Sequence, residues 1–303
     1  MQEGTASSLR DRARGCILGG AIGDAMGGPF EGQPGPLRFG EHSDWRLSDD
    51  TQLTLATCES IIRLGRVSPD HIASEFVERH RARRITGLGS STLKALRDLD
   101  AGQHWALAGA KGEMAAGNGA AMRMAPLAFH LDPRIERERQ IIRDVCRITH
   151  HNEEAYVGGL AIALAIRSLA FDQAAPADLL ELVTRDLPDS RVRDRILAII
   201  SLRDNPSVAE LGIRFGSSGY VVDSVPLALY AAWKIDQIPF EDLLRGVIEA
   251  GGDTDTVASM TGQITGAWLS ASRVPRKLID QLPNVTYIER VTSEFCATLT
   301  DNR

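Results

Sequence analysis

Apolar side chains recur every three to four positions along most of the chain, which is the period of an α-helix and not the two-residue period of a strand. Leu160, Leu164 and the run around Val145 follow this spacing. Gly, Pro, Asp and Asn end the periodic runs near residues 69, 87–89, 132–133, 175–176, 188, 205–206, 216–219, 239 and 251–252, as expected between helices. No convincing strand series appears, so the pattern predicts an all-α fold.

The helical segments form one predicted unit. The sequence contains no internal repeat, no low-complexity segment and no Pro/Ser-rich linker long enough to divide it. We therefore expect residues 1–303 to form one compact multi-helix domain. Two stretches, GCILGGAIGDAMGG and ASMTGQITGAWLSAS, are rich in small residues, which predicts closely packed helices.

Charge and composition restrict the class of protein. With 34 Lys and Arg against 40 Asp and Glu, the net charge is −6, and 43% of residues are hydrophobic, as in soluble globular proteins. This acidity provides no general surface for nucleic acid or an anionic membrane, although a local patch could bind either. The longest uncharged stretches are too short or too polar to cross a bilayer, so no membrane association is predicted.

The four cysteines lie far apart and contain no C-x-x-C pair. This spacing argues against a zinc cluster and gives no indication of a disulfide framework. The N-terminal segment is charged where a signal peptide would be apolar. We therefore expect a reduced, cytoplasmic protein.

Two short acidic segments, SDDT at residues 48–51 and GGDTDT at residues 251–256, each precede an apolar helix. Helix capping alone would account for either one, because Ser, Thr and Asp accept bonds from first-turn amides. If both buried helices begin at one cleft, however, Asp49, Asp50, Asp253 and Asp255 bring four negative charges together. Such a cluster requires cations or large pKa shifts, and a divalent pair would neutralise it.

The donor atoms in these two segments are all oxygens. Ser48 and Thr256 add hydroxyl groups to the four carboxylates, and neither segment contains Cys or His. Such hard ligands suit Mg²⁺, Mn²⁺ or Ca²⁺. A paired site with open positions could orient substrate oxygens and activate a water.

Two further segments contain candidate functional groups. In GDAMGGPFEG, Asp24 and Glu31 flank a glycine-rich turn; without a functional role, Asp24 would bond a neighbouring helix end and Glu31 would be a solvated loop residue. The turn GNGAAMR opens a helix whose free amides could hold phosphate, although such a turn alone is a weak signal.

These segments, in this order, resemble the ADP-ribosylglycohydrolase family, which includes dinitrogenase reductase activating glycohydrolase and the ADP-ribosylarginine and ADP-ribosylserine hydrolases. The similarity runs over residues 14–272. It rests on GDAMGGPFEG, SDDTQLTLA, GNGAAMRMAP, the Thr149-His150 pair followed by Ala155, GYVVDSVPLAL and GGDTDT.

The resemblance implies an all-α fold with a binuclear metal cleft holding two divalent cations, Mg²⁺ or Mn²⁺. The matching metal ligands are Ser48, Asp49, Asp50, Asp253, Asp255 and Thr256. Glu31 matches the acidic loop residue that contacts the metal or gates the site. The matching substrate-binding positions are Gly117, Asn118, Gly119 and Met122, with His150 and Tyr220 near the adenosine end. Without the family, His150 would be a cap or satisfied polar residue and Tyr220 a packing aromatic.

The family chemistry is cleavage of the bond between C1″ of the distal ribose and a side-chain nitrogen or oxygen, which releases ADP-ribose. Asp50 and Glu31 are the candidate catalytic groups for proton transfer or water orientation, and the sequence does not decide between them. The transition state should have oxocarbenium character, which nearby carboxylates would stabilise. The expected partners are ADP-ribose and an ADP-ribosylated target, most simply a protein, and we expect a monomer.

One departure from the family concerns the target. The resemblance implies an acidic residue near Ser90 in arginine-acting relatives, whereas this chain reads GLGSST over residues 87–92. A guanidinium leaving group would be held by a carboxylate, so arginine specificity is in doubt. Asp98 and Asp100 should point elsewhere. Serine-linked ADP-ribose, modified nucleic acid and a small ADP-ribosyl metabolite remain open.

Two other classes of function stay open at this point. One is a non-catalytic ADP-ribose-binding or structural member of the family, which the intact acidic clusters argue against. The other is a two-metal phosphoesterase acting on a nucleotide, because paired metals also serve phosphoryl transfer. A toxin-immunity role also stays open, although no feature of the sequence indicates it.

Overall fold

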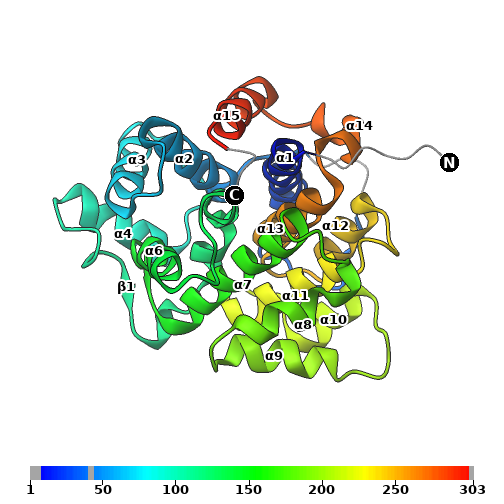
Figure 1. Cartoon of the computed structure of the whole chain (residues 1–303). Coiled ribbons are helices and arrows are strands. Elements are labelled where there is room, and N and C mark those ends of the chain that lie inside the picture. The colour runs from blue at the N-terminus through cyan, green and yellow to red at the C-terminus, as the bar shows by residue number, and fades with distance from the viewer. Residues whose placement is uncertain (1–7, 40–43, 300–303) are drawn as a thin grey trace.

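The computed structural model describes residues 8–39 and 44–299, and it confirms the all-α prediction over these residues (Figure 1). The predicted breakers lie between helices, and several helices begin at a Ser or Asn cap. The helices are α1 (Leu9–Gly27), α2 (Asp49–Leu64), α3 (Pro69–Arg81), α4 (Ser90–Asp100), α5 (Ala125–His130), α6 (Glu136–Arg147), α7 (Glu153–Ala170), α8 (Leu179–Asp186), α9 (Arg191–Ile200), α10 (Val208–Phe215), α11 (Val221–Trp233), α12 (Phe240–Glu249), α13 (Thr254–Leu269), α14 (Arg276–Ile279) and α15 (Val285–Ala297).

Short 3₁₀ turns and one small β-pair connect these helices. The pair is parallel, between β1 (Ala110–Lys111) and β2 (His150–His151). Two-residue strands are too short to produce an alternating pattern, which is why the sequence did not predict them. The 3₁₀ turns are η1 (Gly28–Phe30), η2 (Glu113–Ala115), η3 (Asn118–Arg123), η4 (Pro176–Asp178) and η5 (Ala271–Arg273).

The antiparallel pair of α1 and α13 forms the centre of the fold (Figure 1). Every fourth residue of α1 from Gly15 to Gly27 is a glycine that faces the backbone of α13. A Cβ placed on Gly23 would lie only 2.0 Å from the carbonyl oxygen of Ala258, so any larger side chain would separate the helices. This confirms the predicted close packing. It also brings the C-terminal end of α1 beside the N-terminal end of α13.

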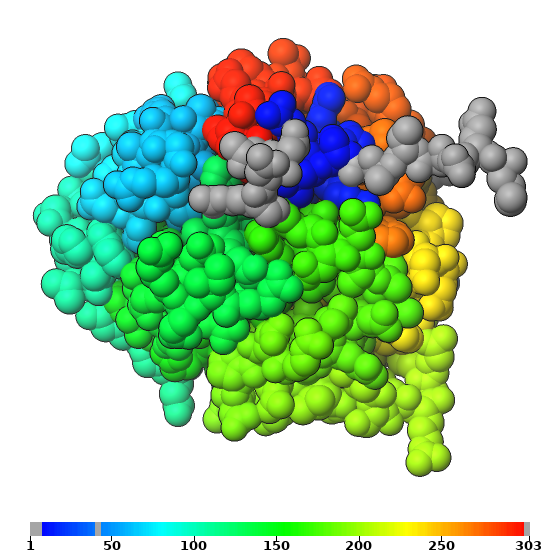
Figure 2. Space-filling model, viewed as in Figure 1, coloured from blue at the N-terminus to red at the C-terminus, as the bar shows by residue number. Residues whose placement is uncertain are grey.

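One continuous cluster of buried apolar side chains surrounds this pair and includes residues from α2, α7, α11 and α15. Helix α15 packs against both α1 and α2, so residues near the two ends of the chain are neighbours. Figure 2 shows this on one face, where blue residues of α1 lie beside orange and red residues of the C-terminal helices. The four cysteines are buried with free thiols, as predicted.

Within the described residues, no helix is both long enough and apolar enough to cross a membrane.

Candidate active site

The N-terminus of α2 is bound to α1 through one buried carboxylate. Ser48 is the N-cap, and its Oγ accepts from the amide of Asp50 at 3.3 Å. Asp24 of α1 accepts from the Ser48 amide at 3.0 Å, from Ser48 Oγ at 2.7 Å and from the Thr51 amide at 3.1 Å. Asp24 is fully buried. It therefore caps a neighbouring helix, as the sequence suggested for this residue.

The N-terminus of α13 is held differently. The Oγ1 of Thr254 donates to the carbonyl of Gly27 at 2.9 Å, which joins this turn to the end of α1. Asp253, the N-cap, makes no side-chain capping bond, and its Oδ2 instead accepts from Asn118 Nδ2 at 2.8 Å. Thr256 Oγ1 donates to Asp50 Oδ2 at 3.1 Å, so the first turns of α13 and α2 are in direct contact.

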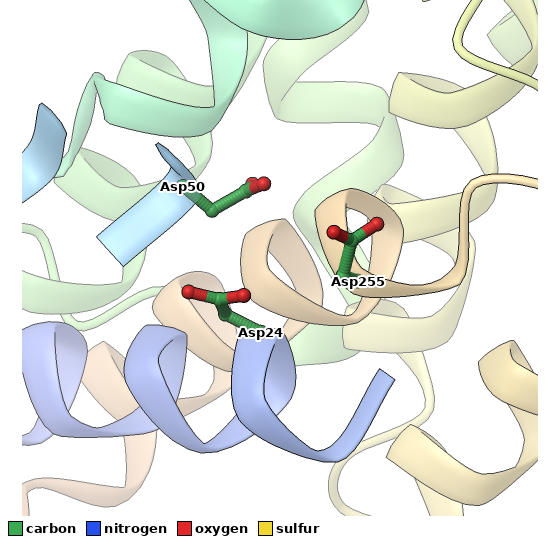
Figure 3. A group of neighbouring side chains, drawn as sticks. All are labelled: Asp24, Asp50 and Asp255. Atoms are coloured by element: carbon green, nitrogen blue, oxygen red, sulfur yellow. The ribbon is translucent and has the colours of Figure 1, made fainter. Parts of the chain in front are cut away.

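The two helix N-termini thus meet, which was the condition for the two acidic segments to form one charged cluster, and α1 adds a third acid. Carboxylate oxygens of Asp24, Asp50 and Asp255 lie within 4.8 Å of one another. Figure 3 shows these side chains entering one shared space from three different helices. All three are buried, which makes their mutual repulsion strong.

The crowding of buried carboxylates changes their acidity. Burial and the neighbouring Asp253 raise the pKa of Asp255 to about 9. Burial, followed by the charge of Asp255, raises the pKa of Asp50 well above its usual range. Burial and the charge of Asp24 do the same to the pKa of Asp49. The apoprotein therefore keeps these carboxylates charged only at a large energetic cost.

This environment fits a divalent cation. The Oδ1 atom of Asp50 is buried and makes no hydrogen bond with any described residue, so one acceptor of the cluster is unsatisfied. Carboxylate and hydroxyl oxygens are the donors that Mg²⁺, Mn²⁺ and Ca²⁺ prefer. A cation coordinated here would satisfy that oxygen and remove the repulsion.

A pocket of about 240 Å³ opens onto the cluster. Its lining includes most of the predicted site residues together with the loop that precedes α4. These lining residues are Glu31, Asp49, Gly87, Gly89, Ser90, Ser91, Thr92, Met114, Gly117, Asn118, Gly119, Met122, His150, Gly219, Asp253, Asp255 and Thr256. Ser48 and Asp50 adjoin the same cluster through their bonds with Asp24 and Thr256.

Glu31 lies beside the acidic cluster on the loop after η1. Gly32 donates its amide to the carbonyl of Gly252 at 2.8 Å, and Gly252 donates to the carbonyl of Gln33 at 2.8 Å, so this loop is bound to the segment that leads into α13. Partial desolvation at the edge of the pocket and the charge of Asp253 raise the pKa of Glu31. Its side chain is exposed and lines the pocket, in agreement with the loop position predicted for it.

His150 lies in the pocket wall with a defined hydrogen-bonding state. The buried guanidinium of Arg123 can only donate, and it donates to Thr149 Oγ1 at 2.7 Å. The hydroxyl hydrogen of Thr149 is then available to His150 Nδ1, which lies 2.7 Å away. Burial and the charge of Arg123 lower the pKa of His150 to about 3. The neutral ring therefore has its hydrogen on Nε2, beside the glycine turn of the pocket.

Tyr220 is not among the residues that line this pocket. Its backbone pairs with Gly117, and Gly219 accepts from the Asn118 amide at 3.0 Å, so this segment supports the glycine turn. The Oη of Tyr220 instead lies 3.4 Å from Arg191. Asp98 and Asp100 also lie outside this pocket, as expected, because Asp98 is bonded to Lys94 and to the Gly109 amide and Asp100 is bonded to Arg81.

Sequence reasoning did not assign functional roles to Asp24 and Arg123. The available signal for Asp24 was a lone acid inside a small-residue, apolar helix, where an unpaired charge is costly. Arg123 is completely buried and contacts Gly119, Val145 and Thr149. Arg123 fixes the hydrogen bond between Thr149 and His150 through contacts between separate elements, which a local sequence pattern does not indicate.

The structure is thus a helical protein in which a pocket opens onto a cluster of buried carboxylates. The family model for ADP-ribosylglycohydrolase matches residues 5–303 of the chain. The chain therefore belongs to the ADP-ribosylglycohydrolase family, and the resemblance noted in the sequence is confirmed.

Relatives with named activities support the same class. The chain is 28% identical to the ADP-ribosylarginine hydrolase Tri1 of Serratia proteamaculans, over 95% of this chain and 80% of the relative. It is 26% identical to human ADP-ribosylhydrolase ARH3, over 90% of this chain and 89% of the relative. An uncharacterized protein of Archaeoglobus fulgidus is 30% identical, over 95% of this chain and 96% of the relative.

A solved structure titled ADP-ribosylglycohydrolase-related protein complex superposes with a TM-score of 0.73 and 26% identity, covering 96% of this chain and 99% of that one. Together with the family match, these relatives identify an enzyme of the glycohydrolase class. They support ADP-ribosyl hydrolysis as its activity.

Proposed function

We propose that this protein is a divalent-metal-dependent hydrolase that cleaves the C1″ bond of ADP-ribosylated proteins and releases ADP-ribose. The observation that supports this most directly is the cluster of Asp24, Asp50 and Asp255, whose carboxylate oxygens lie within 4.8 Å beside a glycine-lined pocket. The relatives' names favour glycosidic cleavage over phosphoester cleavage.

The proposed site holds two divalent cations, Mg²⁺ or Mn²⁺, between the N-termini of α2 and α13. When bound, they supply Lewis acidity toward the ribose hydroxyls and the attacking water. The ligands would be Ser48, Asp49, Asp50, Asp253, Asp255 and Thr256. Asp24 supports this set, because its three accepted bonds hold the α2 side in place. The first-turn amides of both helices favour the anionic ligands.

The glycine turn and His150 would hold the ADP-ribose moiety. Gly117 and Gly119 pack against the His150 ring so closely that an added Cβ would lie 3.1 and 3.0 Å from its atoms, so the glycines allow the turn and the ring to form one wall of the pocket. The Nε2–H group of His150 is a donor and therefore suits a phosphate or hydroxyl oxygen. Asn118 and Met122 complete this wall, and the backbone of Tyr220 supports it.

Glu31 and Asp50 are the two candidates for proton transfer. Asp50 is almost fully buried and already accepts from Thr256, which suits a metal ligand. Glu31 is exposed at the pocket, and its raised pKa allows it to exchange a proton closer to neutral pH. We therefore assign the orientation and deprotonation of the attacking water to Glu31, with Asp50 anchoring the metal pair.

The test is the release of free ADP-ribose, measured by mass spectrometry, from peptides modified on serine or arginine, with Mg²⁺, Mn²⁺ or a chelator. We expect metal-dependent release that falls at least ~1000-fold in the double variant Asp50→Ala/Asp255→Ala, which corresponds to about 4 kcal/mol of barrier. The control Asp242→Ala removes an exposed carboxylate on α12 that lies outside both the acidic cluster and the pocket.

Release of ADP-ribose that continues at the same rate in the presence of the chelator contradicts the proposed role of the metal. ADP-ribose binding without turnover supports a non-catalytic binding protein, and formation of AMP in place of ADP-ribose supports a phosphoesterase.

A further inference from the structure

A second and larger pocket, of about 1010 Å³, adjoins the acidic cluster at Asp255. It is formed mainly by α2, the loop that follows α3, η1 and the beginning of α15. Glu31, Gly87 and Asp255 line both pockets. The two pockets therefore meet at the carboxylates to which we assign the chemistry.

This shared boundary determines which part of the substrate each pocket receives. The reacting C1″ atom must lie at the carboxylates, because the attacking water is oriented there. ADP-ribose is assigned to the smaller pocket by the glycine turn and the Nε2–H donor of His150. The larger pocket, which shares this boundary, is then the space left for the group that leaves C1″.

The outer wall of the larger pocket is cationic. Arg46 and Arg84 are both exposed, and neither has an ion-pair partner among the described residues. Arg79 also lines the pocket, but Glu59 lies 2.6 Å from its guanidinium and neutralises it. Apart from the shared Glu31 and Asp255, no described lining residue of this pocket is a carboxylate.

We propose that the larger pocket binds the target polypeptide and selects an acidic segment that is modified on a serine hydroxyl. This inference rests on the proposed hydrolase function and specifies its substrate. An acidic side chain near the modified residue would pair with Arg46 or Arg84. Asn284, exposed at the same pocket and without a capping bond of its own, offers a hydrogen-bonding group to the peptide backbone.

The charge distribution argues against an arginine target. A guanidinium leaving group requires a carboxylate partner, but the carboxylates among the described residues that line the two pockets are already assigned to the metal site or to proton transfer. They are Glu31, Asp49, Asp253 and Asp255. The arginines of the outer wall would also repel it. A serine hydroxyl needs no such partner. In its reaction the bond from C1″ to serine Oγ breaks, the water oxygen bonds to C1″, and the water proton passes to Oγ.

The same wall favours a peptide over a nucleic acid. Nucleic-acid sites follow the phosphate backbone with a row of cations and free aromatic faces. Here two arginines are unpaired within the described lining, too few to form such a row. The aromatic residues of this lining are Trp45 and Tyr287, and the guanidinium of Arg290 already lies 5.3 Å from the ring centroid of Tyr287.

The experiment compares kcat and KM for four substrates: ADP-ribosylated serine as the free amino acid, the same serine within an acidic peptide, the same serine within a lysine-rich peptide, and an ADP-ribosylated arginine peptide. The variant is Arg46→Glu/Arg84→Glu. The matched control is Arg137→Glu, an exposed arginine on α6 that lines neither pocket.

We expect the wild type to prefer the acidic serine peptide by about tenfold in KM. The double variant should lose this preference in KM with kcat unchanged. Its kcat and KM for the free ADP-ribosylated serine should equal those of the wild type. The control Arg137→Glu should keep wild-type kcat and KM for every substrate. Equal KM values for the acidic and lysine-rich peptides, or an unchanged preference in the double variant, would overturn the docking assignment.

Faster release from the arginine peptide, or from an ADP-ribosylated oligonucleotide used as a fifth substrate, would overturn the assignment of the target class. If none of the substrates, the free amino acid included, yields ADP-ribose, the proposed hydrolase function itself is contradicted. The two failures are therefore distinguishable.

Discussion

Helices α2 and α13 begin with similar acidic sequences, but the structure holds their first turns in different ways. The first turn of α2 is bonded to a carboxylate from inside the core, Asp24 of α1. The first turn of α13 has no capping side chain, and its acid Asp253 is bonded to Asn118 in the glycine turn of the pocket. Both first turns are bonded to α1, that of α2 through Asp24 and that of α13 through Thr254, but only the α13 side is also bonded, through Asp253, to the turn that would contact substrate.

This difference makes a testable distinction between catalysis and binding. Disturbing the support of α2 should displace ligands of the acidic cluster and lower both kcat and stability. Disturbing the support of α13 should mainly change the affinity for ADP-ribose, because the turn that holds Asp253 also lines the pocket.

The largest effect is expected for Asp24→Asn. The amide keeps the size of the side chain, but its NH₂ group must face the donors on Ser48 or Thr51. We expect kcat to fall ~100-fold with little change in KM, and the free energy of unfolding of the metal-loaded protein to fall by about 2 kcal/mol. Steady-state kinetics and urea unfolding measure the two effects. A kcat equal to that of the wild type would show that the first turn of α2 keeps its position without the bonds to Asp24.

A smaller effect is expected for Asn118→Ala, on the α13 side. The substitution removes the 2.8 Å bond to Asp253 and leaves the contacts between α2 and Asp24 intact. We expect about a tenfold weaker affinity for ADP-ribose, measured by calorimetry, with an unfolding free energy within about 1 kcal/mol of wild type. A loss of kcat as large as that of Asp24→Asn would contradict the proposed division between the two helices.

The smallest effect concerns Thr149, which sets the hydrogen-bonding state of His150. In Thr149→Val the ring loses its Nδ1 partner and Arg123 loses an acceptor, whereas Thr149→Ser keeps the hydroxyl. We expect Thr149→Val to weaken ADP-ribose binding about fivefold and Thr149→Ser to bind like wild type. Nitrogen NMR of the ring should show hydrogen on Nε2 in both wild type and Thr149→Ser.

The same spectra test the acidity of His150. Its pKa of about 3 lies below the usual histidine value, so the folded ring should stay neutral throughout pH ~5–8. The unfolded chain binds that proton more readily, and this group therefore lowers stability as the pH falls below ~6.5. Titration of the folded ring near neutral pH would contradict the buried, neutral state.

Much of the architecture could be predicted from local patterns. The helical period, the Gly and Pro breakers and the small-residue stretches of α1 and α13 predicted an all-α fold with closely packed helices. That the two acidic segments share a cleft was implied by the family resemblance and not by the local pattern. Local patterns did not indicate that Tyr220 supports the glycine turn through its backbone. They also did not reveal the larger pocket, because its lining comes from segments far apart in the chain.

The sequence by itself determined the helices, the oxygen-only donor set and the family. These depend on side-chain period and on ordered motifs, which are readable along one dimension. Only the tertiary structure decided that Asp24 holds α2, that Arg123 acts through Thr149 on His150, and that two pockets meet at Glu31 and Asp255. Each of these depends on atoms from distant segments coming within bonding distance, which follows from the packing of α1 against α13.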